Sequence, residues 1–441
     1  MAITSTKAPF HVLIVGAGLG GLSCAISCLN DGLKVTILEK AKELGEIGAG
    51  IQIPPNATRV MTHYGLVDKI ERAGAVTVPG QQLLDYATGK VIIAQPGPEW
   101  HLKQFGHYWY VVHRADYHKV LLDEAIRRGA EIHLDCDVVK VDLSGSVNLA
   151  DGKVHSADVV VGADGLRSSI RTTILGHQVD PVETGDMAFR ITVSRERVAQ
   201  LESPFWNQVL EDGGPRIWLG PLSHVICYPV RNKKIWNVVL LRPDDLPHDV
   251  PTAEADIGEM KAAFKGWDAN LLQMLTCVER CLKWKICHMD ELESWTSGHV
   301  ALLGDACHPT LPYQAQGAAM AVEDGAVLGI LLGELSRLDQ KDQIPEVLHL
   351  YEDLRKKRTT TIVRGAMANA YLFQMSDPEE MAKRNKELAE ADVNDPRSTI
   401  RWTWANMGYQ KNLLGFDTIG NAKQRFAEWS QQNQARLSRT E

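Results

Sequence analysis

Residues 11–21 read HVLIVGAGLGG, a short aliphatic run followed directly by a glycine-rich turn. The glycines at 16, 18 and 21 fit the pattern G-x-G-x-x-G. Gly16 permits a tight turn after a strand, Gly18 lets the backbone approach a pyrophosphate, and Gly21 lets helix and strand pack closely. A phosphate would then lie at the positive N-terminal end of the following helix. The stretch therefore predicts a strand, a phosphate-binding turn and a helix.

An acidic residue completes this dinucleotide motif. Residues 34–38 (KVTIL) form the next predicted strand, and Glu39 ends it 23 residues after Gly16. A carboxylate at this place binds ribose hydroxyls in the adenosine half of a dinucleotide. Strand, helix and strand make a βαβ unit, which predicts a parallel sheet. The motif alone does not separate NAD from FAD.

The composition is that of an ordinary globular protein. The chain has 441 residues, of which 44% are hydrophobic and 23% charged, enough for two or three domains. A net charge of −8 without a long basic run argues against nucleic acid as a partner. With no targeting signal and no membrane-length apolar run, we expect a cytoplasmic monomer or homodimer without a membrane partner. We also expect no metal, since Cys277, Cys281, Cys287 and His288 accompany an alternating apolar run.

The predicted secondary structure changes along the chain from alternating strands and helices to mainly strands, and then back. Four β-like runs (MAFRITV, RIWLG, HVICYPV and IWNVVLL) lie between residues 187 and 241, too many for the first sheet. We predict an α/β protein with a Rossmann-like dinucleotide-binding domain, an inserted β-rich substrate domain and a helical C-terminal region. The predicted ranges are 1–75, 100–180 and 285–375 for the dinucleotide domain, 76–99 and 181–284 for the substrate domain, and 376–441 for the C-terminal region.

Two further motifs follow predicted strands later in the chain. Residues 158–171 read DVVVGADGLRSSIR, and residues 299–309 read HVALLGDACHP. With GAGLGG, in this order and spacing, they resemble the class A flavoprotein monooxygenases, which have the para-hydroxybenzoate hydroxylase fold. The stretch GEIGAGIQIPPNATRV at 45–60 is similar to the salicylate hydroxylase-type members. The resemblance covers roughly residues 9–375 and implies that the dinucleotide is FAD.

The resemblance also implies a set of cofactor contacts. Asp305 would accept hydrogen bonds from the ribityl chain, and the start of the helix that contains Ala318 would stabilise negative charge on the flavin. Arg114 would contact FAD, and Gln52 and Ala318 would contribute backbone contacts. Asp164 would serve both FAD and the pyrophosphate of the nicotinamide nucleotide. Because the chain has no second G-x-G-x-x-G, NADH or NADPH would visit as a co-substrate without a domain of its own.

Substrate contacts are expected on the β-rich insertion. Arg190 lies in an apolar run, so it either pairs with an acidic neighbour or faces a ligand. His224 and Tyr228 share one face of a predicted strand, either as core residues or as pocket residues. Related hydroxylases place His and Tyr here to handle the substrate phenol, so Tyr228, Arg190 and His224 are the candidate catalytic residues. Gln314 is a further candidate, and His308 either lies beside the flavin or caps its loop.

The activity that the resemblance implies is hydroxylation of a small phenol or aromatic acid with NAD(P)H and O2, through a flavin C4a-hydroperoxide. Loss of CO2, as in salicylate-type enzymes, is one form of this reaction. The alternatives are a monooxygenase of a larger secondary metabolite (epoxidation, dearomatisation or Baeyer–Villiger oxidation) and a non-catalytic FAD/NAD-binding regulator. The segment Trp402-Thr403-Trp404 is superficially similar to a flavin halogenase motif, but it lies too near the C-terminus and lacks the following Ile-Pro.

Overall fold

The glycine motif lies at the end of the first strand of a largely parallel sheet. The computed structural model describes residues 9–45 and 49–437, so residues 46–48 of the quoted 45–60 stretch lie outside the described part. The sheet has the order β19-β20-β12-β1-β2-β8. Its strands are β1 (His11–Val15), β2 (Lys34–Leu38), β8 (Glu131–His133), β12 (Val159–Gly162), β19 (Thr296–Ser297) and β20 (Val300–Leu302). All pairs except β19 with β20 are parallel, which confirms the predicted Rossmann-like sheet.

Two helices that begin at the cofactor motifs pack closely against each other. They are α1 (Leu19–Asn30) and α11 (Gly317–Leu338). Small residues permit the close approach, since a Cβ atom added at Gly325 would lie 2.5 Å from the backbone nitrogen of Cys24. The buried hydroxyl of Ser23 donates a hydrogen bond to the Val322 carbonyl at 2.9 Å. This contact fixes the two helix N-termini relative to each other.

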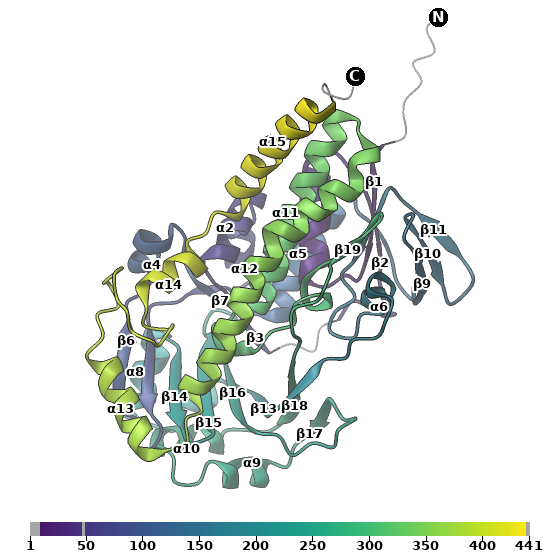
Figure 1. Ribbon diagram of the computed structural model, residues 1–441. Coiled ribbons are helices and arrows are strands. Elements are labelled where there is room, and N and C mark those ends of the chain that lie inside the picture. The colour runs from purple at the N-terminus through teal and green to yellow at the C-terminus, as the bar shows by residue number, and fades with distance from the viewer. Residues whose placement is uncertain (1–8, 46–48, 438–441) are drawn as a thin grey trace, which may run out of the picture.

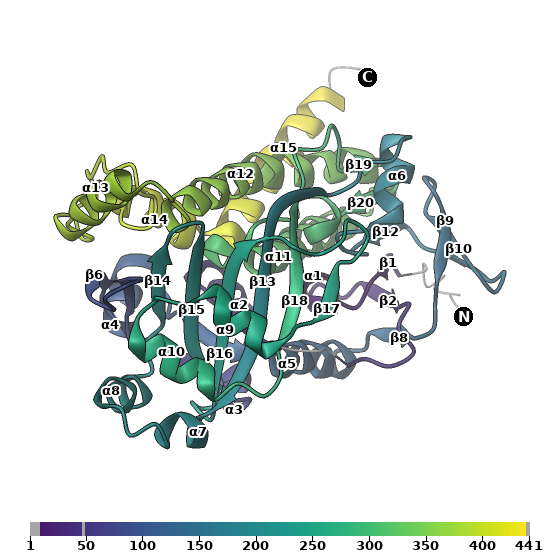
Figure 2. The same ribbon diagram turned by 90° about the horizontal axis from the view of Figure 1, so that it is seen from below.

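The β-rich insertion forms a sheet of eight strands in the order β17-β18-β13-β16-β15-β14-β5-β6. The strands are β5 (Gln81–Asp85), β6 (Val91–Gln95), β13 (Val182–Ser194), β14 (Arg216–Gly220), β15 (Ser223–Val230), β16 (Ile235–Pro243), β17 (Thr252–Glu254) and β18 (Leu282–His288). One face packs on short helices, as Figure 2 shows: α7 (Arg195–Ala199), α8 (Pro204–Asp212), α9 (Ile257–Ala263) and α10 (Ala269–Thr276). The expected domain boundary between residues 284 and 285 falls inside β18.

A small sheet connects the cofactor motifs to the substrate sheet. It has the order β3-β7-β4, formed by β3 (Gly50–Ile53), β4 (Val76–Thr77) and β7 (Tyr110–His113). The Gly50 N–H donates to Asn237 Oδ1 at 2.8 Å, and a Cβ atom at Gly50 would lie 2.5 Å from the ring of Tyr228. The remaining elements of this half are α2 (Pro55–Tyr64), α3 (Val67–Arg72), α4 (Pro98–Phe105), α5 (Arg114–Arg127), α6 (Ser169–Leu175), β9 (Val138–Asp142), β10 (Ser146–Leu149) and β11 (Val154–Ser156).

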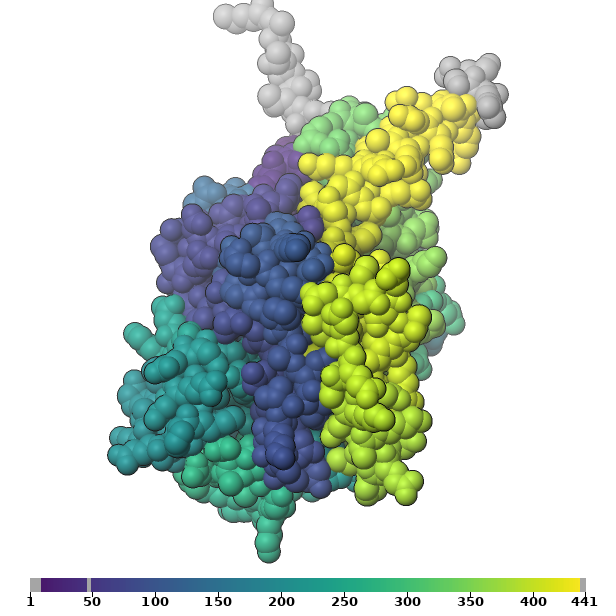
Figure 3. Space-filling model, turned by 90° about the vertical axis from the view of Figure 1, so that its left-hand side faces the viewer, coloured from purple at the N-terminus to yellow at the C-terminus, as the bar shows by residue number. Residues whose placement is uncertain are grey.

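The C-terminal part is helical, as predicted. Its helices are α12 (Ile344–Phe373), α13 (Pro378–Ala389), α14 (Met407–Leu414) and α15 (Thr418–Leu437). Figure 1 shows α11, α12 and α15 running side by side above the substrate sheet. Figure 3 shows the segment with α13 and α14 lying beside the segment that carries β5, β6 and α4. No helix in the described part of the chain has the length and apolarity to span a bilayer.

Candidate active site

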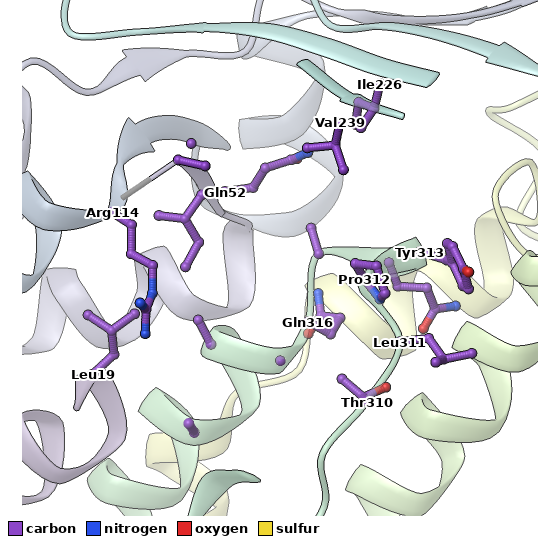
Figure 4. Close-up of a pocket in the computed structure, with 18 of the residues that line it drawn as sticks. Leu19, Gln52, Arg114, Ile226, Val239, Thr310, Leu311, Pro312, Tyr313 and Gln316 are labelled. Carbon is purple, nitrogen blue, oxygen red and sulfur yellow. The ribbon is translucent and has the colours of Figure 1, made fainter. Parts of the chain in front are cut away.

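A cavity of about 540 Å³ is lined by the cofactor motifs and by one face of the substrate sheet. Figure 4 shows Leu19 and Arg114 on one side of it and the loop with Thr310 on the other. Ile226 and Val239 enter from the substrate sheet. Segments more than 100 residues apart in the chain thus meet at one place, with a phosphate-binding turn at one end and an aromatic and aliphatic sheet face at the other.

The three motif glycines meet different demands. Gly16 has a φ of +107°, and a Cβ atom there would overlap the Ala163 carbonyl. A Cβ atom at Gly21 would overlap the Gly16 carbonyl. Gly18 has a φ of −72°, which suits any residue, and no atom of another described residue lies within 4 Å of a Cβ atom placed there. Neither backbone nor packing therefore requires glycine at position 18, which fits a pyrophosphate lying against this turn.

The two acidic residues of the early motifs are held by backbone N–H groups. Glu39 accepts hydrogen bonds from Ala17 N and Ala41 N, both at 2.8 Å, so its carboxylate is fixed beside the glycine turn. Each of its oxygens keeps a second lone pair for ribose hydroxyls. Asp164 Oδ2 instead accepts from Ser169 N (2.9 Å) and Ile170 N, at the start of α6. The residues on either side of Asp164, rather than its own side chain, line the cavity.

The residues predicted to hold the flavin converge on the same cavity. Asp305, in a 3-10 turn after β20, has open surface on its cavity side. Burial raises the pKa of the Asp305 carboxyl, while His308 and Arg114 oppose this rise. Gln52 and Ala318 also line the cavity, and Gln52 Oε1 is buried with no hydrogen-bond partner among the described residues. Such an orphaned polar atom beside two helix N-termini fits FAD at this end.

A buried polar network, not visible in the sequence, supports the loop in front of α11. The amides of Gln316 and Asn56 exchange two hydrogen bonds, at 3.0 and 3.3 Å. Asn56 Nδ2 also donates to Glu323 Oε1, and Glu323 pairs with Arg355 and Arg358. Although burial opposes ionisation, the two arginines lower the pKa of the Glu323 carboxyl. The network holds Gln316, which lines the cavity directly before Gly317 begins α11.

His308, whose role the sequence leaves open, takes part in a buried hydrogen-bond network. Its Nε2 lies 2.5 Å from Asp324 Oδ2, and Arg355 Nε donates to the other oxygen of Asp324 at 2.6 Å. His308 and Arg355 together lower the pKa of the Asp324 carboxyl against the effect of burial. Asp324 also accepts from the backbone N–H of Gly304 at 3.1 Å, so this network secures the loop that carries Asp305.

The three predicted substrate residues share one face of the eight-stranded sheet. The register pairs Arg190 with Val239, and Val239 with Ile226. Residues paired across strands point to the same side, as do residues two apart in one strand. His224 and Tyr228 therefore lie on the face of Arg190, and all three line the cavity. All three are therefore pocket-lining residues, and their contact with a ligand stays a prediction.

Arg190 is a buried cation beside an aromatic ring. Its guanidinium carbon lies 4.7 Å from the centre of the Trp284 ring. In the described part of the chain it forms no ion pair with a carboxylate, and its Nε has no hydrogen-bond partner. Burial lowers the pKa of Arg190, and the nearby Tyr228 opposes this. Burial also raises the pKa of the Tyr228 hydroxyl, so Tyr228 is a neutral donor facing the same space.

His224 and Gln314 lie toward the C-terminal helices. The His224 ring is 5.2 Å from that of Tyr313 and 5.1 Å from that of Phe373, and its Nδ1 has no partner among the described residues. Burial lowers the pKa of His224 to about 3, so the imidazole is neutral. Gln314 donates to the Tyr409 hydroxyl at 2.8 Å, which ties the cavity loop to α14.

Sequence patterns did not identify one wall of the cavity. The wall consists of residues from β5, β6, the segment before β7 and the C-terminal region: Gln81, Gln95, Trp109, Trp404, Gln410 and Leu413. Gln95 Nε2 donates to the Trp404 carbonyl at 2.8 Å, which joins β6 to the C-terminal region. Only tertiary packing brings these segments together. The uncharged side chains at 81, 95 and 410 carried no local signal of a site.

A family model described as "FAD binding domain" matches residues 9–366. The chain belongs to this family of FAD-dependent monooxygenases. It is 37% identical to FAD-dependent monooxygenase OpS4 of Beauveria bassiana over 433 residues, 95% of this chain and 97% of that protein. It is 31% identical to 3-hydroxybenzoate 6-hydroxylase of Polaromonas naphthalenivorans, covering 87% of this chain and 93% of that protein. A substrate complex of salicylate hydroxylase shares the fold, with a TM-score of 0.77, 24% identity and coverage of 95% and 98%.

The predicted enzyme class and cofactor are thereby confirmed. This monooxygenase uses FAD, with NAD(P)H as the co-substrate typical of its family. The resemblance to the aromatic hydroxylases of the hydroxybenzoate type is also confirmed, and the chain shares the fold of a salicylate hydroxylase. The roles of individual residues in the cavity remain predictions.

Proposed function

We propose that this monooxygenase hydroxylates the ring of a phenolic substrate whose oxygen is held by Arg190 and Tyr228. The observation that carries the proposal is the environment of Arg190. It is a cavity-facing cation stacked on Trp284, and no carboxylate of the described residues neutralises it. A buried unpaired charge is costly, so a ligand with a complementary negative oxygen gains from binding there. A phenolate provides that oxygen.

The two residues would prepare the ring for attack by an electrophilic oxygen. The positive charge of Arg190 favours the ionised form of the phenol and so lowers the pKa of the bound substrate. Ionisation pushes electron density into the ring, which is what electrophilic hydroxylation requires. Tyr228, kept neutral by burial, donates a hydrogen bond to the same oxygen and fixes the ring's orientation. FAD, when bound, supplies the redox chemistry by accepting a hydride from NAD(P)H and activating O2.

The surrounding side chains would position the ring and exclude water. Ile226 and Val239 provide aliphatic surface next to Arg190, and the neutral His224 offers an unpartnered Nδ1 farther along the sheet. An apolar wall strengthens the electrostatic effect of the buried guanidinium. The relative named for 3-hydroxybenzoate supports a hydroxylated aromatic ring as the substrate class.

The direct test is substrate-stimulated oxidation of NAD(P)H by the FAD-loaded protein. A panel of simple and substituted phenols is assayed while O2 uptake and CO2 release are followed together. We expect phenols to accelerate NAD(P)H oxidation with matched O2 uptake, and matched CO2 release only where the hydroxylated carbon carries a carboxylate. A protein that binds FAD but whose NAD(P)H oxidation no phenol accelerates would be a binding protein or act on another substrate class.

A further inference from the structure

The cavity face of the substrate sheet extends beyond the proposed phenol site to β5. Ile217 of β14 pairs with Ile226 on one side and with Leu83 of β5 on the other. Ile226, Ile217 and Leu83 thus form one row across three strands. Tyr228 lies two residues from Ile226, and Gln81 lies two residues from Leu83 on the same side of this row. Two inter-strand spacings therefore separate Tyr228 from Gln81, roughly 10 Å between backbones. Arg190 lies two strands farther away, roughly 19 Å from the strand of Gln81.

Two buried N–H donors at this far end have no acceptor in the part of the chain that the structure describes. Gln81 is 3% exposed and Trp109 8% exposed, and both line the cavity. Gln81 Nε2 and Trp109 Nε1 have no hydrogen-bond partner among the described residues. The neighbouring amides differ, because Gln95 donates to the Trp404 carbonyl and Gln410 to the Thr403 carbonyl. Since a buried donor is normally paired, the two free donors indicate an acceptor that arrives with a ligand.

The far end carries no formal charge in the part of the chain that the structure describes. Its lining consists of amide, indole and aliphatic groups: Gln81, Gln95, Trp109, Ile217, Trp404, Gln410 and Leu413. An ionised carboxylate here would lose its hydration without gaining a cation. The acceptor that fits is a neutral oxygen, such as that of a ketone, ester, amide or hydroxyl.

We propose that Gln81 and Trp109 form a distal subsite that binds a neutral oxygen on a substituent of the substrate. The inference rests on the proposed function and narrows its substrate class. The reacting phenol lies at Arg190 and Tyr228, and a side group extends along the sheet to Gln81. The substrate is then a phenol that carries an uncharged polar side group and is longer than a single benzoic acid ring. Trp404 and Leu413 of the C-terminal region line the cavity at the Gln81 end and would limit the length of the side group.

Three phenols of nearly equal size test the subsite: 4-(3-oxobutyl)phenol, 4-butylphenol and 3-(4-hydroxyphenyl)propanoate. They offer a neutral carbonyl, no acceptor and a carboxylate at the same place. Dissociation constants are measured from the change in flavin absorbance of the holoenzyme. We expect the ketone to bind about 10-fold tighter than 4-butylphenol, and the propanoate to bind more weakly than the ketone.

Variants assign that preference to the two donors. Gln81→Leu should abolish the advantage of the ketone and leave the affinity for 4-butylphenol within about twofold. Trp109→Phe, which keeps an aromatic ring, should reduce the advantage in part. Gln82→Leu is the matched control, because Gln82 points to the opposite face of β5, and it should leave the preference unchanged.

The binding and oxidation measurements distinguish a wrong distal subsite from a wrong phenol site. Equal binding of the ketone and 4-butylphenol, or a ketone advantage that survives Gln81→Leu, overturns the subsite while NAD(P)H oxidation still responds to phenols. Tightest binding by the propanoate overturns it as well. If none of the three phenols binds the holoenzyme or stimulates NAD(P)H oxidation, both the subsite and the phenol site are wrong.

Discussion

The guanidinium carbon of Arg190 lies 4.7 Å from the centre of the Trp284 ring, on the cavity side of two adjacent strands, β13 and β18. The indole supports the cation without neutralising it, because a cation–π contact is electrostatic but contributes no negative formal charge. Arginine also stays protonated when its pKa falls modestly. The enzyme thus keeps a positive charge at the place where the proposed substrate carries its phenol oxygen.

Replacement of Arg190 tests that charge. Arg190→Met should weaken phenol binding by about 10- to 100-fold, the value of a hydrogen bond to a charged group. It should also raise the pH at which the bound phenol ionises, since the cation that favours the phenolate is gone. The absorbance of the bound phenolate across a pH series measures both effects. Arg242→Met removes a cation paired with Asp245 elsewhere on the sheet and should change neither. Equal affinity and ionisation in Arg190→Met would assign Arg190 a structural role.

Tyr228 is proposed to donate a hydrogen bond to the phenol oxygen while remaining un-ionised. Burial raises the pKa of its hydroxyl, so the group does not ionise over the working pH range. Tyr228→Phe should lower the hydroxylation rate about 10-fold at every pH, without introducing or removing an ionisation step. The pH profile of kcat measures this. Tyr110→Phe serves as control, because that hydroxyl donates to Glu71 outside the cavity. A rate unchanged by Tyr228→Phe over the whole pH range contradicts the role.

The glycine turn allows a paired test of fold and cofactor. Gly21→Ala places a methyl group against the Gly16 carbonyl and should destabilise the apoprotein by about 1–3 kcal/mol, as overpacking does. The methyl group of Gly18→Ala meets no atom within 4 Å among residues 9–45 and 49–437, so the variant should leave apoprotein stability unchanged. It should nevertheless weaken FAD binding at least about 10-fold, because the methyl group occupies the approach of the pyrophosphate. Thermal unfolding and FAD titration separate the two effects. Normal FAD affinity in Gly18→Ala would place the pyrophosphate elsewhere.

The buried His224 should make the fold sensitive to acid. Its pKa is about 3 in the folded state and about 6.5 in the unfolded chain. The unfolded state therefore binds a proton first, and stability is lost as the pH falls below 6.5 toward 3. His224→Phe removes this proton linkage. When the pH falls from 7.5 to 5, the free energy of unfolding of the variant should therefore decrease by about 2 kcal/mol less than that of the wild type. Urea unfolding at the two pH values measures the difference. Parallel losses in both proteins would mean that His224 is already protonated or solvated in the fold.

Local patterns in the sequence were sufficient for the cofactor half of the fold. The run HVLIV, the glycine turn and KVTIL each carry their own strand, turn or helix signal. The structure forms β1, α1 and β2 in that order, and β2 spans the predicted residues 34–38. The placement of Asp305 after β20 follows from the same rule, because strand ends of a parallel sheet gather at one edge.

The arrangement of the substrate site could not be predicted from local sequence patterns, because it depends on strand register and tertiary packing. The alternation around Arg190 showed that the residue was in a strand, but its contact with Trp284 depends on the register between β13 and β18. The wall formed by Gln81 and Trp404 depends on packing between segments more than 300 residues apart in the chain. Asp164 was placed correctly after a strand, yet its carboxylate is used at the start of α6. Tertiary contacts decided each of these points.

Isotopic labelling shows whether the enzyme inserts oxygen into the ring of a phenol. The FAD-loaded enzyme is supplied with NAD(P)H, 18O2 and the phenol that stimulates it most strongly, and the product is analysed by mass spectrometry. We expect one atom of 18O in a new ring hydroxyl for each NAD(P)H consumed, and loss of this coupling in Arg190→Met. Products without 18O, or NAD(P)H consumption that releases only hydrogen peroxide with every phenol, would contradict ring hydroxylation of a phenol.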